Sequence, residues 1–296
     1  MGRALDEKVA VVTGAGNGIG RSEALELTAH GAALVVNDIE PAAASAVADE
    51  IKALGGNALA VPGDCSSEDV AARLIEAALS EYGRLDALVN NAGLLRDGLL
   101  FESQPSDWDV IFKVHLRGHF APTYFACRHW TGNADGGRIV CTTSTSGLLG
   151  NVTQAAYGAA KAGIAAFSTI VAQEMSPFGV TCNAIAPTAR TRLTKAGAGL
   201  PPTHAFDFWN PDNVAPFVAY LCSDWSAHIS GKVFAVSGDA VELYRPPVSA
   251  AVIRNVQRRW TLDELRVSVD QLFVEADVDP APEDMMAKLR FTMNGY

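Results

Sequence analysis

A doubly wound α/β fold, in which helices cover both faces of a parallel sheet, is the architecture predicted by this 296-residue sequence. Two observations support it. Short apolar runs rich in Val and Ala alternate with longer stretches of helical period. These runs are continuously apolar instead of alternating, as expected of strands that are buried on both faces. The sequence contains no internal repeat, so one sheet and one core are expected.

Seven strands are predicted, separated by helices. The first two are VAVVTG at 9–14 and ALVVND at 33–38, followed by helices at 18–30 and 41–54 respectively. The other strands are predicted at 57–64, 86–93, 137–144, 179–187 and 232–238. Because parallel strands are joined by right-handed crossovers, all seven are expected to lie parallel in a single sheet.

The domain built on this sheet is expected to span residues 1–245. Residues 194–211, rich in Gly, Pro and aromatic side chains, interrupt the pattern beside the carboxyl ends of strands, where a mobile lid would lie. Residues 246–296 form a C-terminal extension, in which Thr261 and Glu264 match a capping box that opens a helix to about 275. The extension is expected to pack on the core or on a neighbouring subunit.

The composition argues against several classes of protein. The chain has 23 Lys and Arg against 33 Asp and Glu, a formal charge of -10, which repels nucleic acids. Its 49% hydrophobic content and mean hydropathy of +0.12 fit a globular protein. We expect no membrane partner, because no signal sequence is recognisable and no apolar run approaches the roughly 20 residues of a membrane span.

The cysteines indicate a reducing compartment. There are five, an odd number without CxxC spacing, so neither a disulfide framework nor a metal site is expected. A cytoplasmic location is therefore predicted.

Residues 13–20, Thr-Gly-Ala-Gly-Asn-Gly-Ile-Gly, lie between the first strand and the first helix. Gly14 permits a tight turn, Gly18 lets backbone amides approach a pyrophosphate, and Gly20 lets helix and strand pack closely. A flexible connection is the alternative interpretation. Because Asp38 lies 18 residues beyond Gly20, where a carboxylate can accept both adenosine ribose hydroxyls, dinucleotide binding is favoured.

Asp38 also favours NAD over NADP. Its carboxylate would repel a 2′-phosphate, and neither Asn17 nor Ile39 supplies a cation to bind one. The alternative role of Asp38 is to cap the helix at 41–54.

The motifs resemble those of the short-chain dehydrogenase/reductase family over about residues 7–240. They are TGAGNGIG at 13–20, Asp64, NNAG at 90–93, and Ser144 placed 13 residues before the first residue of Tyr157-Gly-Ala-Ala-Lys161. The resemblance implies a single-domain Rossmann-type sheet. It also implies an oxidoreductase that interconverts a secondary alcohol and a ketone by hydride transfer with NAD.

Tyr157 and Lys161 are four residues apart, so they project from one face of a helix, where an ammonium favours a phenolate. Ser144, at a strand end, can donate a hydrogen bond to the substrate oxygen. The resemblance implies that Tyr157 exchanges the hydroxyl proton and that Lys161 also holds the nicotinamide ribose. Where the family usually has Asn, this chain has His115, which can relay a proton or be a structural residue satisfied by backbone carbonyls.

The glycine turn and the resemblance together imply a set of cofactor-binding residues. They are Gly14, Asn17, Gly18, Ile19, Gly20, Asp38, Asp64, Asn91, Ala92, Gly93, Tyr157, Lys161, Pro187 and Thr191. Thr188 departs from the glycine that usually follows the proline.

Within the family, several stretches are similar to (3R)-hydroxyacyl-CoA dehydrogenase units of peroxisomal multifunctional enzyme type 2 and to stand-alone bacterial relatives. These stretches are VVNDI (35–39), NAGLLRDG (91–98), VHLRGHF (114–120), GNVTQAAYGAAK (150–161), CNAIAPTARTRLT (182–194) and NVAPFVAYLC (213–222). The subgroup also has His in its VHLRG stretch. The Gly-rich insertion expected after VVND is absent, and no hydratase or sterol-carrier domain is expected.

Cations and apolar side chains near the predicted site fit a 3-hydroxyacyl-CoA. They are Arg96, Arg190, Arg192 and Lys195, and Leu148, Leu149, Phe206, Phe208 and Trp209. A steroid, a terpene or another small carbonyl compound fits the same residues. A non-catalytic NAD-binding regulator is a further alternative, against which the intact Ser144, Tyr157 and Lys161 argue.

A homo-oligomer, either a dimer or a homotetramer, is implied by the resemblance. Family members usually pair through two long helices, here about 107–131 and 154–178. Small side chains on the second helix would permit close packing against a symmetric copy. A buried core helix would have a similar sequence.

Overall fold

A single eight-stranded sheet forms the centre of the computed structural model, which describes residues 3–133, 136–192, 206–283 and 285. The strand order is β3-β2-β1-β4-β5-β6-β7-β8. Strands β1 to β7 run parallel and β8 is antiparallel to β7. The order reverses between β1 and β4, and ligands of doubly wound sheets bind at this switch point, at the carboxyl ends of the strands.

The strands are β1 (Val9–Val12), β2 (Ala33–Val36), β3 (Ala58–Ala60), β4 (Ala87–Asn90), β5 (Gly137–Thr142), β6 (Val180–Thr188), β7 (Val233–Ser237) and β8 (Ala240–Tyr244). The α-helices are α1 (Gly18–Ala29), α2 (Pro41–Ala53), α3 (Glu68–Tyr82), α4 (Pro105–Phe112), α5 (Gly118–Gly132), α6 (Thr145–Leu149), α7 (Ala155–Met175), α8 (Ala215–Cys222), α9 (Leu262–Ser268) and α10 (Asp270–Ala276). A π-helix η1 (Lys113–Arg117) and 3-10 turns η2 (Ser176–Phe178), η3 (Pro211–Asn213) and η4 (Asp224–Ser226) complete the set.

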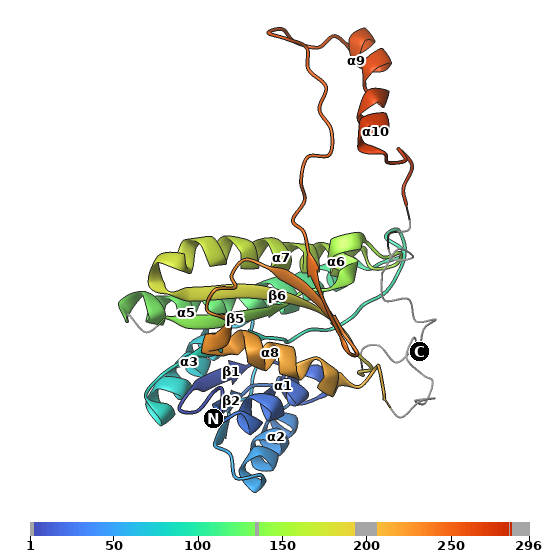
Figure 1. Cartoon of the computed structure of the whole chain (residues 1–296). Helices are drawn as coiled ribbons and strands as arrows, with labels where there is room; N and C mark the ends of the chain where they lie inside the picture. Colours follow the sequence, from blue (N-terminus) through green and yellow to red (C-terminus); the bar gives the residue numbers. More distant parts are fainter. Residues whose placement is uncertain (1–2, 134–135, 193–205, 284, 286–296) are drawn as a thin grey trace.

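Helices cover both faces of the sheet, as predicted (Figure 1). On one face α1, α2 and α8 bury side chains such as Leu27, Val47 and Val218 against the strands. On the other face α3, α5 and α7 bury side chains such as Leu74 and Ile164. The doubly wound architecture is confirmed.

An eighth strand, β8, corrects the prediction of seven. It pairs with β7 through a hairpin in which Ser237 lies opposite Ala240, so the turn consists of Gly238 and Asp239. Gly238 has a φ of +54°, a conformation that glycine adopts without strain. Strand β8 is an antiparallel edge strand with no buried residue, so it lacks the continuous apolar run by which the other strands were recognised.

One predicted long helix, at 107–131, is interrupted. It consists of α4, the π-helix η1 and α5 in direct succession. The π-helix contains His115, whose side chain is buried. Because π-bulges are frequent at functional sites, this interruption makes His115 a candidate functional residue.

Helix α7 with η2, Ala155–Phe178, is long and apolar enough to cross a membrane by length and composition alone, with a mean hydropathy of 1.3. This qualifies the expectation that the sequence has no such stretch. The core helix of a water-soluble protein passes the same test, and α7 packs against β5, β6, α4 and α6.

Residues 245–283, hereafter the C-terminal arm, follow β8 and extend away from the sheet (Figure 1). The capping box is present, since Thr261 and Glu264 bond each other's backbone N–H groups. The helix predicted to 275 is divided into α9 and α10. None of the described residues from 245 to 283 is buried, and Val248, Leu262 and Val274 are each about four-fifths exposed.

Candidate active site

Residues of the glycine turn form a narrow loop between β1 and α1. Gly14 and Gly18 have φ values of +61° and +55°, which L-residues rarely adopt. A Cβ on Gly14 would lie 2.7 Å from Ala92 Cα, and one on Gly20 would lie 2.4 Å from the Gly14 carbonyl oxygen. Helix α1 begins at Gly18, and its N-cap, Asn17, makes no side-chain cap bond. The backbone is thus arranged to receive an anion at a helix N-terminus.

The turn is fixed to the end of β4 by hydrogen bonds. Asn91 Nδ2 donates to the carbonyl oxygens of Thr13 and Gly14, each at 3.0 Å. Thr13 Oγ1 accepts from the N–H groups of Asn91 and Ala92 at 3.1 and 3.2 Å. Asn91 therefore acts on the loop that would hold the cofactor. Thr13 has the same effect, and the sequence prediction did not include it.

Asp38 lies directly after β2 and is buried. Its two carboxylate oxygens accept hydrogen bonds from the N–H groups of Gly16 at 2.9 Å and Glu40 at 3.0 Å. The Gly16 contact joins the carboxylate to the glycine turn. Glu40, not Asp38, is the N-cap of α2. The ribose-binding interpretation thus fits better than the capping one.

Arg192, which the sequence prediction assigned to the substrate, lies instead near Asp38. Arg192 is within 3.7 Å of Glu40, although it was expected beside the substrate. Two carboxylates, Asp38 and Glu40, and one guanidinium therefore meet where the adenosine ribose would bind.

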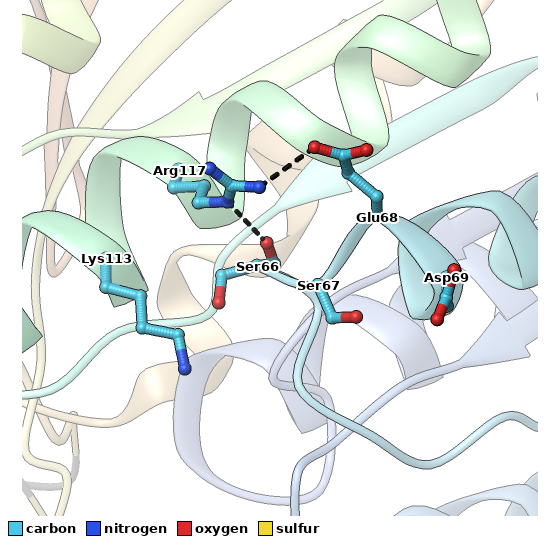
Figure 2. A pocket seen from close by; sticks show the side chains of 6 residues that line it. All are labelled: Ser66, Ser67, Glu68, Asp69, Lys113 and Arg117. Carbon is cyan, nitrogen blue, oxygen red and sulfur yellow. Dashed lines mark hydrogen bonds and ion pairs between the residues drawn. The ribbon is translucent and has the colours of Figure 1, made fainter.

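Asp64 follows β3 and forms an ion pair with Lys113 at 2.8 Å. Partial burial raises the pKa of Asp64, but hydrogen bonds from Lys113 and Ser66 outweigh it, so the pKa lies below its usual value. Beside this pair is a polar hollow of about 500 Å³ (Figure 2), bordered by Ser66, Ser67, Glu68, Asp69, Lys113 and Arg117. None of the candidate catalytic residues borders this hollow, so it belongs to the Asp64 side of the site.

Ser144 and Tyr157 lie together, as the motif spacing predicts. Ser144 is the N-cap of α6, where its Oγ accepts from Ser146 N at 3.2 Å, and it forms a side-chain hydrogen bond with Tyr157. Burial raises the pKa of Tyr157, the Ser144 hydrogen bond opposes this, and the charge of Asp97 adds to it. A lowering by Lys161 together with an oxidised nicotinamide stays a prediction.

The environment of Lys161 limits its electrostatic effect on Tyr157. Its ammonium lies 5.6 Å from the centre of the Tyr157 ring and donates to the Thr142 carbonyl oxygen at 2.6 Å. Burial lowers the pKa of Lys161 to about 7, so near neutral pH this residue carries only part of its positive charge. The spacing correctly placed Lys161 beside Tyr157, but it could not show that the amine is buried.

His115 is buried against Tyr157, with ring centres 5.2 Å apart and the rings nearly perpendicular. Its Nε2 lies 2.7 Å from the Leu94 carbonyl oxygen and 3.2 Å from Leu94 N. Because the contact to the carbonyl oxygen is the shorter one and needs a donor, we assign the proton to Nε2. Burial holds the pKa of His115 well below its usual value. The ring is therefore neutral, and its Nδ1 is a buried acceptor with no hydrogen-bond partner in the described parts of the chain. A purely structural histidine would have both nitrogens satisfied.

Glycine at position 93 makes room for this ring. A Cβ on Gly93 would lie 2.6 Å from His115 Cε1. Ala92 and Gly93 thus lie between the glycine turn on one side and His115 on the other.

The end of β6 lies across the glycine turn. Pro187 and Thr188 are in the strand, where Thr188 pairs with Ser237, so the departure at 188 leaves an ordinary extended backbone. Thr191 lies 3.3 Å from where a Cβ of Gly18 would be. Ile19 packs against the hydrophobic core.

The predicted substrate cations have acidic partners. Arg190 pairs with Asp207 at 2.5 Å, and Arg96 lies 3.6 Å from Asp107. Lys195 and residues 194–205 of the predicted lid lie outside the described residues. The described part of the predicted lid, 206–211, is tied down by a hydrogen bond from Arg190 N to the Trp209 carbonyl oxygen at 2.7 Å.

The expected apolar side chains are partly exposed. Leu148 and Leu149 on α6 are half-buried, and Phe206 is 43% exposed. Phe208 packs against Gly238, where a Cβ would lie 2.1 Å from its ring, so it contacts the β7–β8 hairpin.

The candidate residues come from the carboxyl ends of six strands and from α7 and η1, and they meet at the switch point of the sheet. The glycine turn and the Asp38 carboxylate bonded to it fit a dinucleotide, because they place backbone N–H groups and a carboxylate where phosphate and ribose would bind. Asn91 holds the turn in this shape. Tyr157, Ser144 and Lys161 supply a hydroxyl pair and an amine beside it.

Comparison with known proteins agrees with this geometry. The family model for short chain dehydrogenases matches residues 8–198. The hydroxyacyl-CoA dehydrogenase ChsB1 of Mycobacterium tuberculosis is 42% identical over 274 residues, which cover 88% of this chain and 84% of the relative. Peroxisomal multifunctional enzyme type 2 of Drosophila melanogaster is 40% identical over 84% of this chain, but this chain spans only 42% of that enzyme.

A solved structure is similar over nearly the whole chain. It is a short chain dehydrogenase from Mycobacterium avium, 41% identical, with a TM-score of 0.86 over 94% of this chain and 98% of that one. The protein therefore belongs to the short-chain dehydrogenase/reductase family and is an oxidoreductase.

Proposed function

We propose that the protein is an NAD-dependent dehydrogenase that oxidises the secondary alcohol of a 3-hydroxyacyl-CoA to the ketone, or catalyses the reverse reduction. The single observation that supports this reaction best is Tyr157, whose ring lies beside Ser144, Lys161 and the neutral His115. The substrate class is supported by the hydroxyacyl-CoA relative, which is similar to this chain over most of its length.

In this proposal NAD supplies the carbon that accepts hydride from the substrate. Gly14, Gly18 and the start of α1 would hold its pyrophosphate, and Asp38 the adenosine ribose. Asp64 would lie at the adenine, and Pro187 and Thr191 beside the nicotinamide. At the turn itself, backbone N–H groups and not charged side chains would orient the pyrophosphate.

Tyr157 would take the hydroxyl proton as the hydride leaves, and Ser144 would donate a hydrogen bond to the substrate oxygen. Ser144 Oγ already accepts from Ser146 N, so its own hydrogen points to another acceptor, which is Tyr157 or the substrate. Lys161, when protonated, would stabilise the phenolate. The unpartnered His115 Nδ1 would accept a hydrogen bond from a water or the substrate.

The proposal is tested by steady-state assays with NAD and 3-hydroxyacyl-CoA esters of increasing chain length, beside steroid and terpene alcohols. Turnover of the acyl-CoA esters is expected. Turnover of steroid or terpene alcohols alone would refute the proposed substrate and leave the reaction type intact. NAD binding without turnover of any alcohol would support a regulator instead.

Replacing Asp38 with alanine is expected to weaken NAD binding by about 10- to 100-fold, because the hydrogen bonds at the adenosine ribose are lost. NADP binding should weaken less or improve, since one negative charge near the 2′-phosphate is removed while Arg192 stays close. Calorimetric titration with each cofactor measures the ratio of the NAD and NADP dissociation constants. Asp49→Ala, an exposed carboxylate on α2, is the matched control. An unchanged ratio in Asp38→Ala would contradict the assignment of NAD.

We also propose a homo-oligomer in which α5 and α7 pair with a second copy and the C-terminal arm packs on a neighbouring subunit. Phe120, Tyr124 and Ile170 on these helices are each about half exposed, and the arm buries nothing in its own chain. An exposed apolar surface of this extent is typical of a subunit contact.

Light scattering is expected to give a multiple of 31.2 kDa for the full chain. Ile170→Glu should lower the measured mass by disrupting the contact between helices of two copies. Val274→Glu should weaken the contact of the C-terminal arm. Each variant puts a charge into an apolar contact. Glu76→Gln on α3 is the control. A wild-type mass near 31.2 kDa would refute the assembly.

We further propose a cytoplasmic location, consistent with five free cysteines and open to test by fractionation.

A further inference from the structure

His119 on α5 is a fully buried histidine to which the proposed reaction gives no role. It lies one turn after His115. Its Nδ1 is 2.7 Å from the His115 carbonyl oxygen, and its Nε2 is 3.2 Å from Thr142 N. The side chain thus joins the π-helix η1 to the end of β5.

The ring has a single protonation state that satisfies both contacts. A carbonyl oxygen needs a donor and a backbone N–H needs an acceptor, so the proton is on Nδ1 and the lone pair on Nε2. Burial and the nearby Lys161 lower the pKa of His119 to about 3, and the surrounding backbone hydrogen bonds only partly oppose this. The charged or titratable groups that face it are Lys161 from α7 and His115 from η1. The ring therefore stays neutral and both bonds are permanent.

Thr142 shows what the contact achieves. Thr143 N donates to Ile185 O of β6. Because successive residues of a strand point their backbone N–H and C=O groups to opposite sides, the N–H and C=O of Thr142 point toward β4. Strand β4 ends at Asn90, opposite Cys141, so the last bond of this ladder runs from Thr142 N to Asn90 O and no residue of β4 pairs with Thr142 O. His119 Nε2 is a second acceptor for Thr142 N at 3.2 Å, and Lys161 donates to Thr142 O at 2.6 Å in place of a strand.

We infer that His119 is a positioning residue for Lys161. As a second partner of Thr142 N beside the last bond of the ladder, it helps to fix the carbonyl oxygen that orients the ammonium. By donating to His115 O it ties the same strand end to the π-helix that carries His115. The inference rests on the proposed role of Lys161 in the reaction. It adds to Ser144, Tyr157 and Lys161 a residue that contacts neither Tyr157 nor the glycine turn.

Two isosteric variants separate the two bonds. The side chain of His119→Gln can place its oxygen near the position of Nε2 and keep the contact to Thr142. The side chain of His119→Asn can place its amide nitrogen near the position of Nδ1 and keep the contact to His115. His119→Leu removes both, and His129→Gln, half-buried on the same helix, is the control.

We expect His119→Leu and His119→Asn to lower kcat by about 10- to 100-fold with little change in KM, since the ground-state contacts to substrate are intact. The apparent pKa for alcohol oxidation should rise by about one unit, because a less well held ammonium stabilises the phenolate less. His119→Gln should recover most of the loss. The pKa of Tyr157 itself is read from absorbance at 295 nm, as the difference between each protein and its Tyr157→Phe partner, with no substrate present.

Equal losses in His119→Gln and His119→Asn, or a lower unfolding temperature with unchanged pH profiles and an unchanged Tyr157 titration, would overturn the inference and leave a structural role. If His119→Leu does not fold, the comparison of Gln with Asn decides. Failure of the proposed function is distinguishable, because Tyr157→Phe would then keep its turnover. If Tyr157→Phe has no turnover and His119→Gln and His119→Asn lose equal activity, the role of His119 is refuted and the proposed function stands.

Discussion

Replacing Tyr157 with phenylalanine is expected to lower kcat by about 1,000-fold or more, because the hydroxyl is the group proposed to exchange the substrate proton. The ring stays, so its edge contact with His115 and its packing beside Lys161 are kept. NAD affinity should change by less than about threefold, since the proposed phosphate and ribose contacts come from the glycine turn and Asp38. Steady-state kinetics and calorimetric NAD titration measure the two quantities.

Tyr124→Phe is the matched control, because Tyr124 is 43% exposed on α5, where it contacts Phe120, Phe125 and Arg128. It should keep full turnover. A Tyr157→Phe enzyme with more than about a tenth of wild-type kcat would show that another group moves the proton. An equal loss of NAD binding and turnover would point instead to a disturbed fold.

The sequence was informative about the parts of the site that local rules determine. A Gly at position 14 or 18 is required by a positive φ, and a four-residue spacing brings Tyr157 and Lys161 to one helix face. Continuous apolar runs identified the seven parallel strands, because such strands are buried on both faces. The carboxyl ends of parallel strands lie along one edge, which is why distant motifs were expected to meet.

The parts that were missed depend on long-range contacts. The edge strand β8 has no buried face that a periodic pattern could reveal. His119 acts through the backbone of Thr142, which is 23 positions away in the sequence and has no distinctive side-chain chemistry. The raised pKa of Tyr157 depends on burial, which no motif specifies. Thr13 was within the recognised motif, but its hydrogen bonds to Asn91 and Ala92 are visible only in three dimensions.

A buried carboxyl group outside the recognised motifs leads to the second large effect. Glu23 on α1 is fully buried, and neither of its oxygens has a hydrogen-bond partner among the described residues. Helix α1 packs against α8, where the Cys222 thiol is also buried and its pKa is raised by burial and by the charge of Glu23. Burial raises the pKa of Glu23 from 4.5 to about 8.

The sign of the effect on stability follows from proton binding. Between pH 4.5 and about 8 the folded protein holds a proton on Glu23 that the unfolded chain releases. The contribution of Glu23 to the free energy of unfolding therefore falls as pH rises through this window, by about 1.4 kcal/mol per unit. Above about pH 8 the folded protein must carry a buried carboxylate, and the accumulated loss is on the order of 5 kcal/mol.

Glu23→Gln removes the titration and nearly preserves the shape. We expect wild type and variant to have similar stability near pH 5 and the variant to be more stable at pH 8.5 by several kcal/mol, as measured by urea unfolding at one protein concentration. Glu26→Gln, on the same helix with a partly exposed carboxyl, is the control and should show no such divergence. If the difference between wild type and Glu23→Gln is constant from pH 5 to 8.5, Glu23 is charged in the folded protein throughout. It must then have a compensating partner or water inside the α1–α8 contact.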